Sequence, residues 1–164
     1  SASGDSLAES RYSYLYAFLE HQLRFPRGVL LGLQLTAQIA NDRLPDVEKL
    51  AIGGGRAVRG YDTNLGAGED GAFARATLYL PTFALIKASD QLSPSISPFV
   101  FSDIGEVREQ QSNQATRLSS AGLGFDLTIG KYASTSVTAA YALRDGGATD
   151  GGDVFVDARV DLRF

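Results

Sequence analysis

Arg59 lies in a stretch that is rich in glycine, with Gly53, Gly54 and Gly55 before it and Gly60 after it. Glycine permits positive φ angles and close approach of the backbone to a neighbouring surface. If the stretch folds back into the protein, the guanidinium of Arg59 becomes confined and needs a carboxylate, preferably in two-point geometry. Charge pairing is therefore the chemistry that this segment predicts. By itself, the same composition also fits an ordinary surface loop.

Other kinds of chemistry find little support. His21 is the only histidine, and alternation places it on the same strand face as Leu19 and Leu23. There is no cysteine, no G-x-S-x-G turn and no glycine-rich phosphate loop. We therefore expect neither an enzyme nor a cofactor or metal site. The net charge of −4 is spread along the chain, which argues against a nucleic-acid partner.

The elements that must position these residues are strands, because apolar side chains recur at every second position. The C-terminal strand is the clearest, with apolar Val154, Val156 and Val160 alternating with charged Asp157 and Arg159. The same reading predicts strands over residues 12–23, 29–39, 72–81, 95–107, 122–129, 134–143 and 154–164, with a short one over 47–52.

These segments make about eight strands, most of them about ten residues long, which is the length that crosses a bilayer when tilted. Residues 26–28 and 130–132 read as tight turns, whereas 53–71, 109–115 and 145–153 read as longer polar loops. We predict an all-β fold, an antiparallel transmembrane β-barrel. The sequence contains no run of about 18 apolar residues, so no membrane-spanning helix is predicted. A soluble β-sandwich or a lipocalin-like barrel also alternates, so periodicity leaves that alternative open.

Two motifs favour the membrane barrel. The run from Leu50 to Asp62, with Val58-Arg59-Gly60-Tyr61 at its centre, resembles the sixth-loop signature of the Omp85 superfamily. Downstream, residues 101–105 (Phe-Ser-Asp-Ile-Gly) are similar to the F-x-D-x-G strand motif of that superfamily. Residues 38–44 and 48–50 resemble the stretch before this loop in two-partner-secretion transporters of the haemolysin secretion-activation (TpsB) type. The loop and strand motifs occur in the order of the superfamily and at a plausible spacing, which is more specific than either motif alone.

The resemblance implies a role for each motif residue. Asp103 is the expected partner of Arg59, and Phe101 is expected to pack on the guanidinium plane. Gly105 would leave room for the loop, while Tyr61 would supply an aromatic body with a hydrogen-bonding tip. The chain would correspond to the C-terminal half of a barrel of about sixteen strands, and a barrel of only about eight is filled by its own side chains. A small closed barrel or one completed by a second copy remains an alternative.

The final strand carries a further expectation. Val160, Leu162 and the terminal Phe164 lie on one face, which resembles the signal that delivers outer-membrane proteins to the barrel-assembly machinery. An ordinary edge strand would look similar. We expect residues 1–10 to be a flexible segment and residues 11–164 to form one barrel domain with an inserted loop at about 53–71.

The resemblance implies a bacterial outer-membrane pore component that secretes a large exoprotein from the periplasm to the cell surface. Expected partners are that exoprotein, membrane lipid and lipopolysaccharide, the assembly machinery, and a second copy if one closes the barrel. Two further alternatives are an Omp85-type factor that assembles other barrels and a small, non-transporting barrel with a structural or adhesive role.

Overall fold

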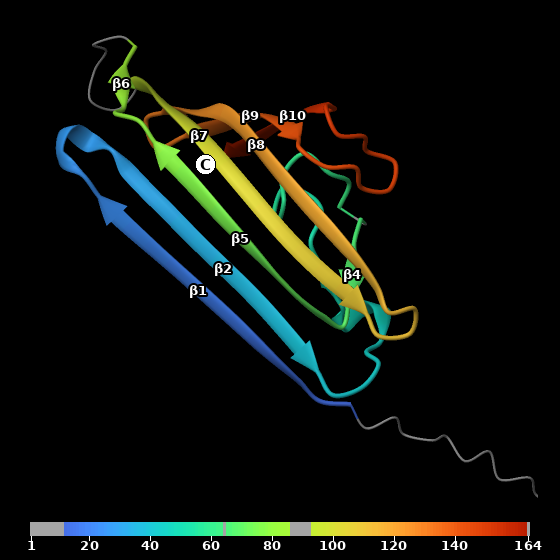
Figure 1. The fold of residues 1–164 in the computed structure, drawn as a ribbon. Helices are drawn as coiled ribbons and strands as arrows, with labels where there is room; N and C mark the ends of the chain where they lie inside the picture. The colour runs from blue at the N-terminus through green and yellow to red at the C-terminus, as the bar shows by residue number, and fades with distance from the viewer. Residues whose placement is uncertain (1–11, 64, 86–92, 164) are drawn as a thin grey trace, which may run out of the picture.

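The chain folds into one long antiparallel sheet (Figure 1). A computed structural model describes residues 12–63, 65–85 and 93–163. Its long strands, in spatial order, are β1 (Tyr14–Arg24), β2 (Leu30–Ala40), β5 (Asp70–Tyr79), β7 (Pro94–Glu109), β8 (Gln114–Ile129), β9 (Ala133–Ala142) and β10 (Val154–Leu162). A short strand, β6 (Phe83–Ala84), pairs with β7 as the eighth member. The prediction of an antiparallel all-β fold is confirmed.

The sheet is open rather than closed. In the described part of the chain, β1 pairs with β2 alone and β10 with β9 alone, so each leaves one edge without a strand partner. These strands therefore do not form the small closed barrel that was one alternative. The described residues outside the sheet include two single-turn 3-10 helices, η1 (Pro26–Gly28) and η2 (Asp46–Glu48), and none of their helices is long and apolar enough to cross a membrane.

Two sequence predictions need correction. The short strand expected over 47–52 is only β3 (Leu50–Ala51), which pairs with β4 (Ala67–Gly68) in a separate two-stranded sheet. Strand β8 begins at Gln114 rather than at residue 122, so the expected long loop over 109–115 is a short turn. The physical reason is that β7 and β8 extend past the apolar band. The first residues of β8 are mostly polar or small on both faces, apart from the core residue Leu118, so the alternation is too weak to predict a strand there.

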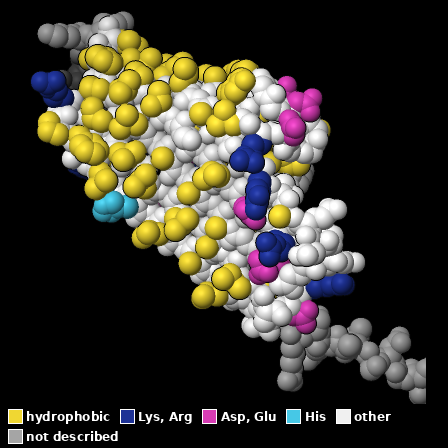
Figure 2. All heavy atoms as spheres, in the orientation of Figure 1, with side chains coloured by type: hydrophobic (Ala, Val, Ile, Leu, Met, Phe, Trp, Pro, Cys, Tyr) yellow, Lys and Arg dark blue, Asp and Glu magenta, His cyan; other side chains and the backbone are white. Residues whose placement is uncertain are grey.

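One face of the sheet is apolar and exposed (Figure 2). Cross-strand register aligns Leu19 with Leu35, and Val100 with Leu123, on this face. Other exposed apolar residues on the same face are Leu15, Ile39, Ile104, Tyr141, Val154 and Val156. Charged side chains gather toward one end of the face (Figure 2). Near the end of the β7–β8 ladder, Arg117 donates two hydrogen bonds to Glu106. This face has the pattern of a lipid-facing wall that ends at a polar boundary.

The inserted loop, described over residues 41–63 and 65–69, leaves β2, packs on part of the opposite face and returns into β5. The buried core lies between this loop and the sheet. It contains Leu50, Ile52, Ala57, Val58, Tyr61, Phe73, Val107, Leu118 and Ala142. The main hydrophobic cluster is thus formed between the inserted loop and the long sheet, which we call the wall, rather than between two sheets packed face to face. The flexible segment expected over residues 1–10 and the terminal Phe164 lie outside the described residues.

Candidate functional site

The tip of the inserted loop has its own folded structure. The Val58 amide donates to the Ile52 carbonyl, and the Gly53 amide donates to the Leu65 carbonyl. A Cβ at Gly53 would lie 2.1 Å from the carbonyl oxygen of Asp62, so only glycine fits there. Gly54 has a φ of +94°, whereas Gly55 is exposed and a Cβ there would meet nothing within 4 Å. Two of the three predicted loop glycines are therefore required by the fold of the tip.

The folded tip delivers Arg59 to Asp103 on β7. Nε of Arg59 lies 2.7 Å from Oδ2, and Nη2 lies 2.7 Å from Oδ1, so the guanidinium binds both carboxylate oxygens. The backbone amide of Arg59 donates to Oδ2 as well, at 3.1 Å. The Asp103 side chain is fully buried and that of Arg59 is 11% exposed. Charge-assisted bidentate pairs of this kind are short and directional, and they fix both partners.

The wall also holds the guanidinium from its flat side and its far end. Cζ of Arg59 lies 3.6 Å from the centre of the Phe101 ring, which is a cation–π contact. Nη2 also donates to the hydroxyl of Thr77, at 3.0 Å. The Phe101 ring occupies the space above Gly122, where a Cβ would meet ring carbon Cζ at 2.5 Å. Two strands beside β7 therefore help to place the loop arginine.

The other motif residues pack around this ion pair. A Cβ at Gly105 would lie 3.1 Å from Cγ2 of Val58, so the missing side chain is the space in which Val58 sits. Gly60 has a φ of +89°, and a Cβ there would lie 3.0 Å from that of Ala140. The buried Tyr61 hydroxyl lies 2.7 Å from the Ser119 carbonyl and 2.9 Å from the Arg144 carbonyl, either of which can accept its proton. The structure thus brings the loop motif and the strand motif together.

Sequence reasoning missed two residues at this site, Arg75 on β5 and Ser120 on β8. Register places them directly across from Asp103 on its two sides. Nε of Arg75 lies 3.9 Å from Oδ1 of Asp103, and Nη1 donates to the Arg56 carbonyl of the loop. The sequence shows alternation within each strand but not which residues stand opposite each other across strands. No signal in the sequence alone assigns these neighbours.

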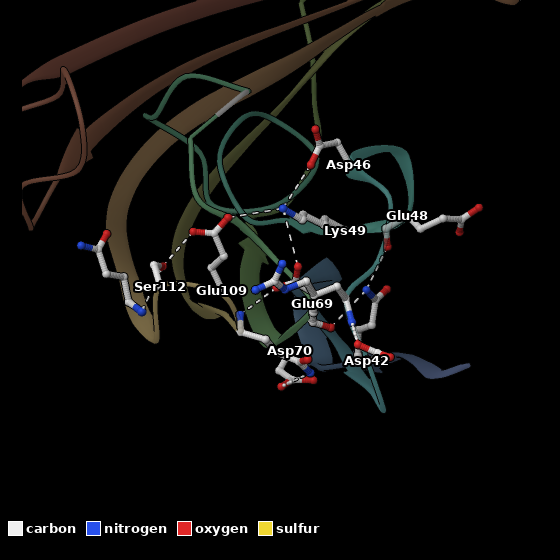
Figure 3. Close-up of polar contacts among 12 residues, drawn as sticks. Asp42, Asp46, Glu48, Lys49, Glu69, Asp70, Glu109 and Ser112 are labelled. Atoms are coloured by element: carbon white, nitrogen blue, oxygen red, sulfur yellow. Dashed lines mark hydrogen bonds and ion pairs between the residues drawn. The ribbon is translucent and has the colours of Figure 1, made fainter. Parts of the chain in front are cut away.

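A second polar cluster holds the base of the inserted loop (Figure 3). The Lys49 ammonium lies 3.1 Å from Asp46, 3.4 Å from Glu109 and 3.6 Å from Glu69. Glu69 is 2% exposed, and its carboxylate also accepts a hydrogen bond from the Gln110 amide. The hydrogen bond to Asp46 is the largest cause of a raised pKa of Lys49, with Glu109 and Glu69 adding to it against the effect of burial. The inserted loop is therefore attached to the wall near its tip and at its base.

The residues of the C-terminal strand motif lie elsewhere. Val160 and Leu162 are exposed on β10, on the apolar face of the sheet and away from the inserted loop. Phe164 lies outside the described residues. Within the described ranges, no group of three or more histidine, aspartate or glutamate side chains is arranged to hold a metal ion.

Comparisons with known proteins found a matching family and a similar solved structure. The model of the haemolysin secretion/activation protein family ShlB/FhaC/HecB matches residues 1–127. No curated protein matches the sequence. Among solved structures, the chain is similar to CdiB from Escherichia coli, with a TM-score of 0.68 and 22% identity. The match covers 92% of this chain and 27% of the CdiB chain, and at that identity it shows the fold alone.

The family match covers most of the sequence, and it agrees with the resemblance that the two motifs suggested. The members of this family are outer-membrane β-barrel proteins of Gram-negative bacteria, so the predicted location is confirmed as well. The chain belongs to the ShlB/FhaC/HecB haemolysin secretion/activation family, the two-partner-secretion branch of the Omp85 superfamily.

Proposed function

We propose that this chain forms part of the wall of an outer-membrane pore through which a partner exoprotein is secreted, and that its inserted loop is held in the lumen by the Arg59–Asp103 pair. The chain spans 27% of the length of CdiB, so the activity of a whole transporter is a proposal for the full-length protein. The proposal involves no catalytic step, cofactor or metal ion.

The observation that carries the proposal is the buried, bidentate ion pair between the loop tip and the wall. A fully buried carboxylate is costly unless it is paired and hydrogen-bonded. Asp103 receives three hydrogen bonds from Arg59, two from the guanidinium and one from the backbone amide. A loop docked in this way sets how much of the lumen stays open, and release of the pair would enlarge it.

The two faces of the sheet support the same proposal. The apolar face would contact membrane lipid and lipopolysaccharide, and the opposite face would line the lumen. Open strand edges are not tolerated in lipid, so β1 and β10 must each gain a partner there. We assign that role to the remaining strands of the full-length barrel, and residues 11–164 to one continuous part of its wall. A second copy is the alternative, and a dimeric mass for the purified full-length protein would favour it.

The C-terminal strand has a separate proposed role. Val160 and Leu162 point to the apolar face, where the barrel-assembly machinery could bind them together with Phe164 before the barrel closes. This contact would act in biogenesis rather than in secretion. Replacing these residues should therefore lower the amount of inserted protein without changing the secretion that each inserted molecule supports.

The ion pair is tested by Arg59→Ala in the full-length protein. We expect less exoprotein in the culture medium, measured by immunoblot against the cell-associated amount, because the loop loses its fixed position. Insertion should persist, and is measured by the shift of the folded barrel on unheated gels. Arg59→Lys is the matched control, since lysine keeps the charge but cannot form the two-point contact. Secretion at the normal level from Arg59→Ala would remove the proposed role of the pair.

A further inference from the structure

The wall carries a second cation beside Asp103. Arg75 on β5 stands directly across from Asp103, and its Nε lies 3.9 Å from Oδ1. Two guanidinium groups therefore share one carboxylate when the loop is docked. The pair of Arg75 and Asp103 is neutral by itself, so with Arg59 docked these three side chains together carry one surplus positive charge.

Arg75 also has an unused hydrogen-bond donor. Among the described residues, three buried side-chain atoms lack a hydrogen-bond partner: Thr36 Oγ1, Arg75 Nε and Ser120 Oγ. Two of these three belong to the cross-strand neighbours of Asp103, Arg75 on one side and Ser120 on the other. Buried donors are normally satisfied in folded proteins. Their position on both sides of one carboxylate indicates that they serve a state in which Arg59 is absent.

We infer that Arg75 is a positioning residue that takes over Asp103 when the inserted loop leaves the wall. In the docked state, Nη1 of Arg75 binds the loop at the Arg56 carbonyl, 3.2 Å away. Undocking removes Arg59 and that carbonyl together. A shift of about 1 Å then brings Nε of Arg75 into charge-assisted hydrogen-bond range of Oδ1. Ser120 can rotate its hydroxyl toward the same carboxylate, because its Oγ has no other partner.

This exchange lowers the free energy that is needed to release the loop. Removing one partner of a buried ion pair is strongly unfavourable, because it leaves an uncompensated charge. With Arg75 in reserve, Asp103 keeps a counter-charge in both states, so the loop can leave without exposing the wall to that penalty. The inference rests on the proposed docking of the loop through Arg59, and it adds that the ion pair is built to be reversible.

Loop release is measured by chemical labelling of a cysteine in the full-length barrel, since these 164 residues contain none. Ala57→Cys places the thiol at a position that is 4% exposed, where N-ethylmaleimide reacts only after the loop leaves. Gly55→Cys is the matched control, because that position is exposed in the docked loop. Other cysteines of the full-length protein are removed, and urea below the unfolding transition brings release into the measurable range. Equal labelling of the two sites would contradict docking itself, and with it the proposed function.

The test of the inference is Arg75→Gln in the Ala57→Cys background. We expect labelling to slow by about tenfold or more, since release now leaves Asp103 without a counter-charge. Arg75→Lys should restore a rate close to that of the unchanged protein, because it keeps a cation beside Asp103. If Arg75 only held the loop through the Arg56 carbonyl, Arg75→Gln would speed labelling instead. Faster or unchanged labelling therefore overturns the inference.

A second measurement keeps the inference testable if Arg75→Gln does not insert. In the Arg59→Ala protein, Arg75 should already be paired with Asp103. Adding Asp103→Asn should then lower the urea concentration at the unfolding midpoint, because it breaks the substitute pair. If Asp103 were bare in Arg59→Ala, neutralising it would raise that midpoint. A raised or unchanged midpoint contradicts the takeover by Arg75.

Discussion

Gly105→Ala tests how closely the loop and the wall fit. A new Cβ would lie 3.0 Å from Cβ of Phe73, 3.1 Å from Cγ2 of Val58 and 3.4 Å from the carbonyl oxygen of Ala72. Normal carbon–carbon contact is about 3.5–4.0 Å. The atoms of Phe73 and Ala72 are fixed to the backbone of β5, so the Val58 side chain, and the loop with it, must move.

The magnitude follows from the part of the overpacking that depends on the loop. Overpacking of a buried site costs about 1–3 kcal/mol. The contacts with Phe73 and Ala72 lie within the sheet and are present whether the loop is docked or released, as is the gain of about 0.5–1 kcal/mol that alanine has over glycine in a strand. Only the contact with Val58 acts on docking, and its share of the cost is about 1–2 kcal/mol, which is roughly a five- to thirtyfold shift in the docking equilibrium. The ion pair itself is untouched by this change, so the effect reports packing alone.

The assay is the labelling of Ala57→Cys, compared between Gly105→Ala and Gly55→Ala. Both substitutions add one methyl group, but at Gly55 it meets nothing within 4 Å. We expect Gly105→Ala to speed labelling by roughly five- to thirtyfold and Gly55→Ala to change it little. Equal rates in the two variants would refute the view that Gly105 makes room for the loop.

Two further contacts yield predictions of their own. Tyr61→Phe removes a hydroxyl that bonds the Ser119 and Arg144 backbone, so the docked loop should lose about 1–3 kcal/mol, seen as faster Ala57→Cys labelling; an unchanged rate would show that water replaces the hydroxyl. The raised pKa of Lys49 means that its contacts contribute below the ordinary lysine value of 10.5 and are lost as pH rises through the higher folded value. The urea midpoint of the unchanged protein should therefore fall below that of Lys49→Arg only above about pH 10.5. A lower midpoint of the unchanged protein already at pH 7 would contradict this.

Alternation predicted most of the wall because a strand with one apolar and one polar face has a period of two in the sequence. The strands at 29–39 and 134–143 begin and end within one or two residues of β2 and β9. The prediction was wrong where strands run past the apolar band, as at Gln114, and where a short apolar run belongs to the loop, as at Leu50. At the start of β8 mostly polar or small residues surround Leu118, so the period is weak, and Leu50 packs with Leu118 in the core beneath the loop rather than on the long sheet.

At the candidate site, the residues themselves determined the chemistry: a cation among glycines needs an acid, and the motif resemblance named Asp103 for Arg59. Only the tertiary structure decided what surrounds that pair. Arg75 and Ser120 meet Asp103 through interstrand register, and Glu69 is buried because the base of the loop folds over it. Register and burial depend on which segments pack together in space. They arise from contacts between residues far apart along the chain, which no local pattern of residue types encodes.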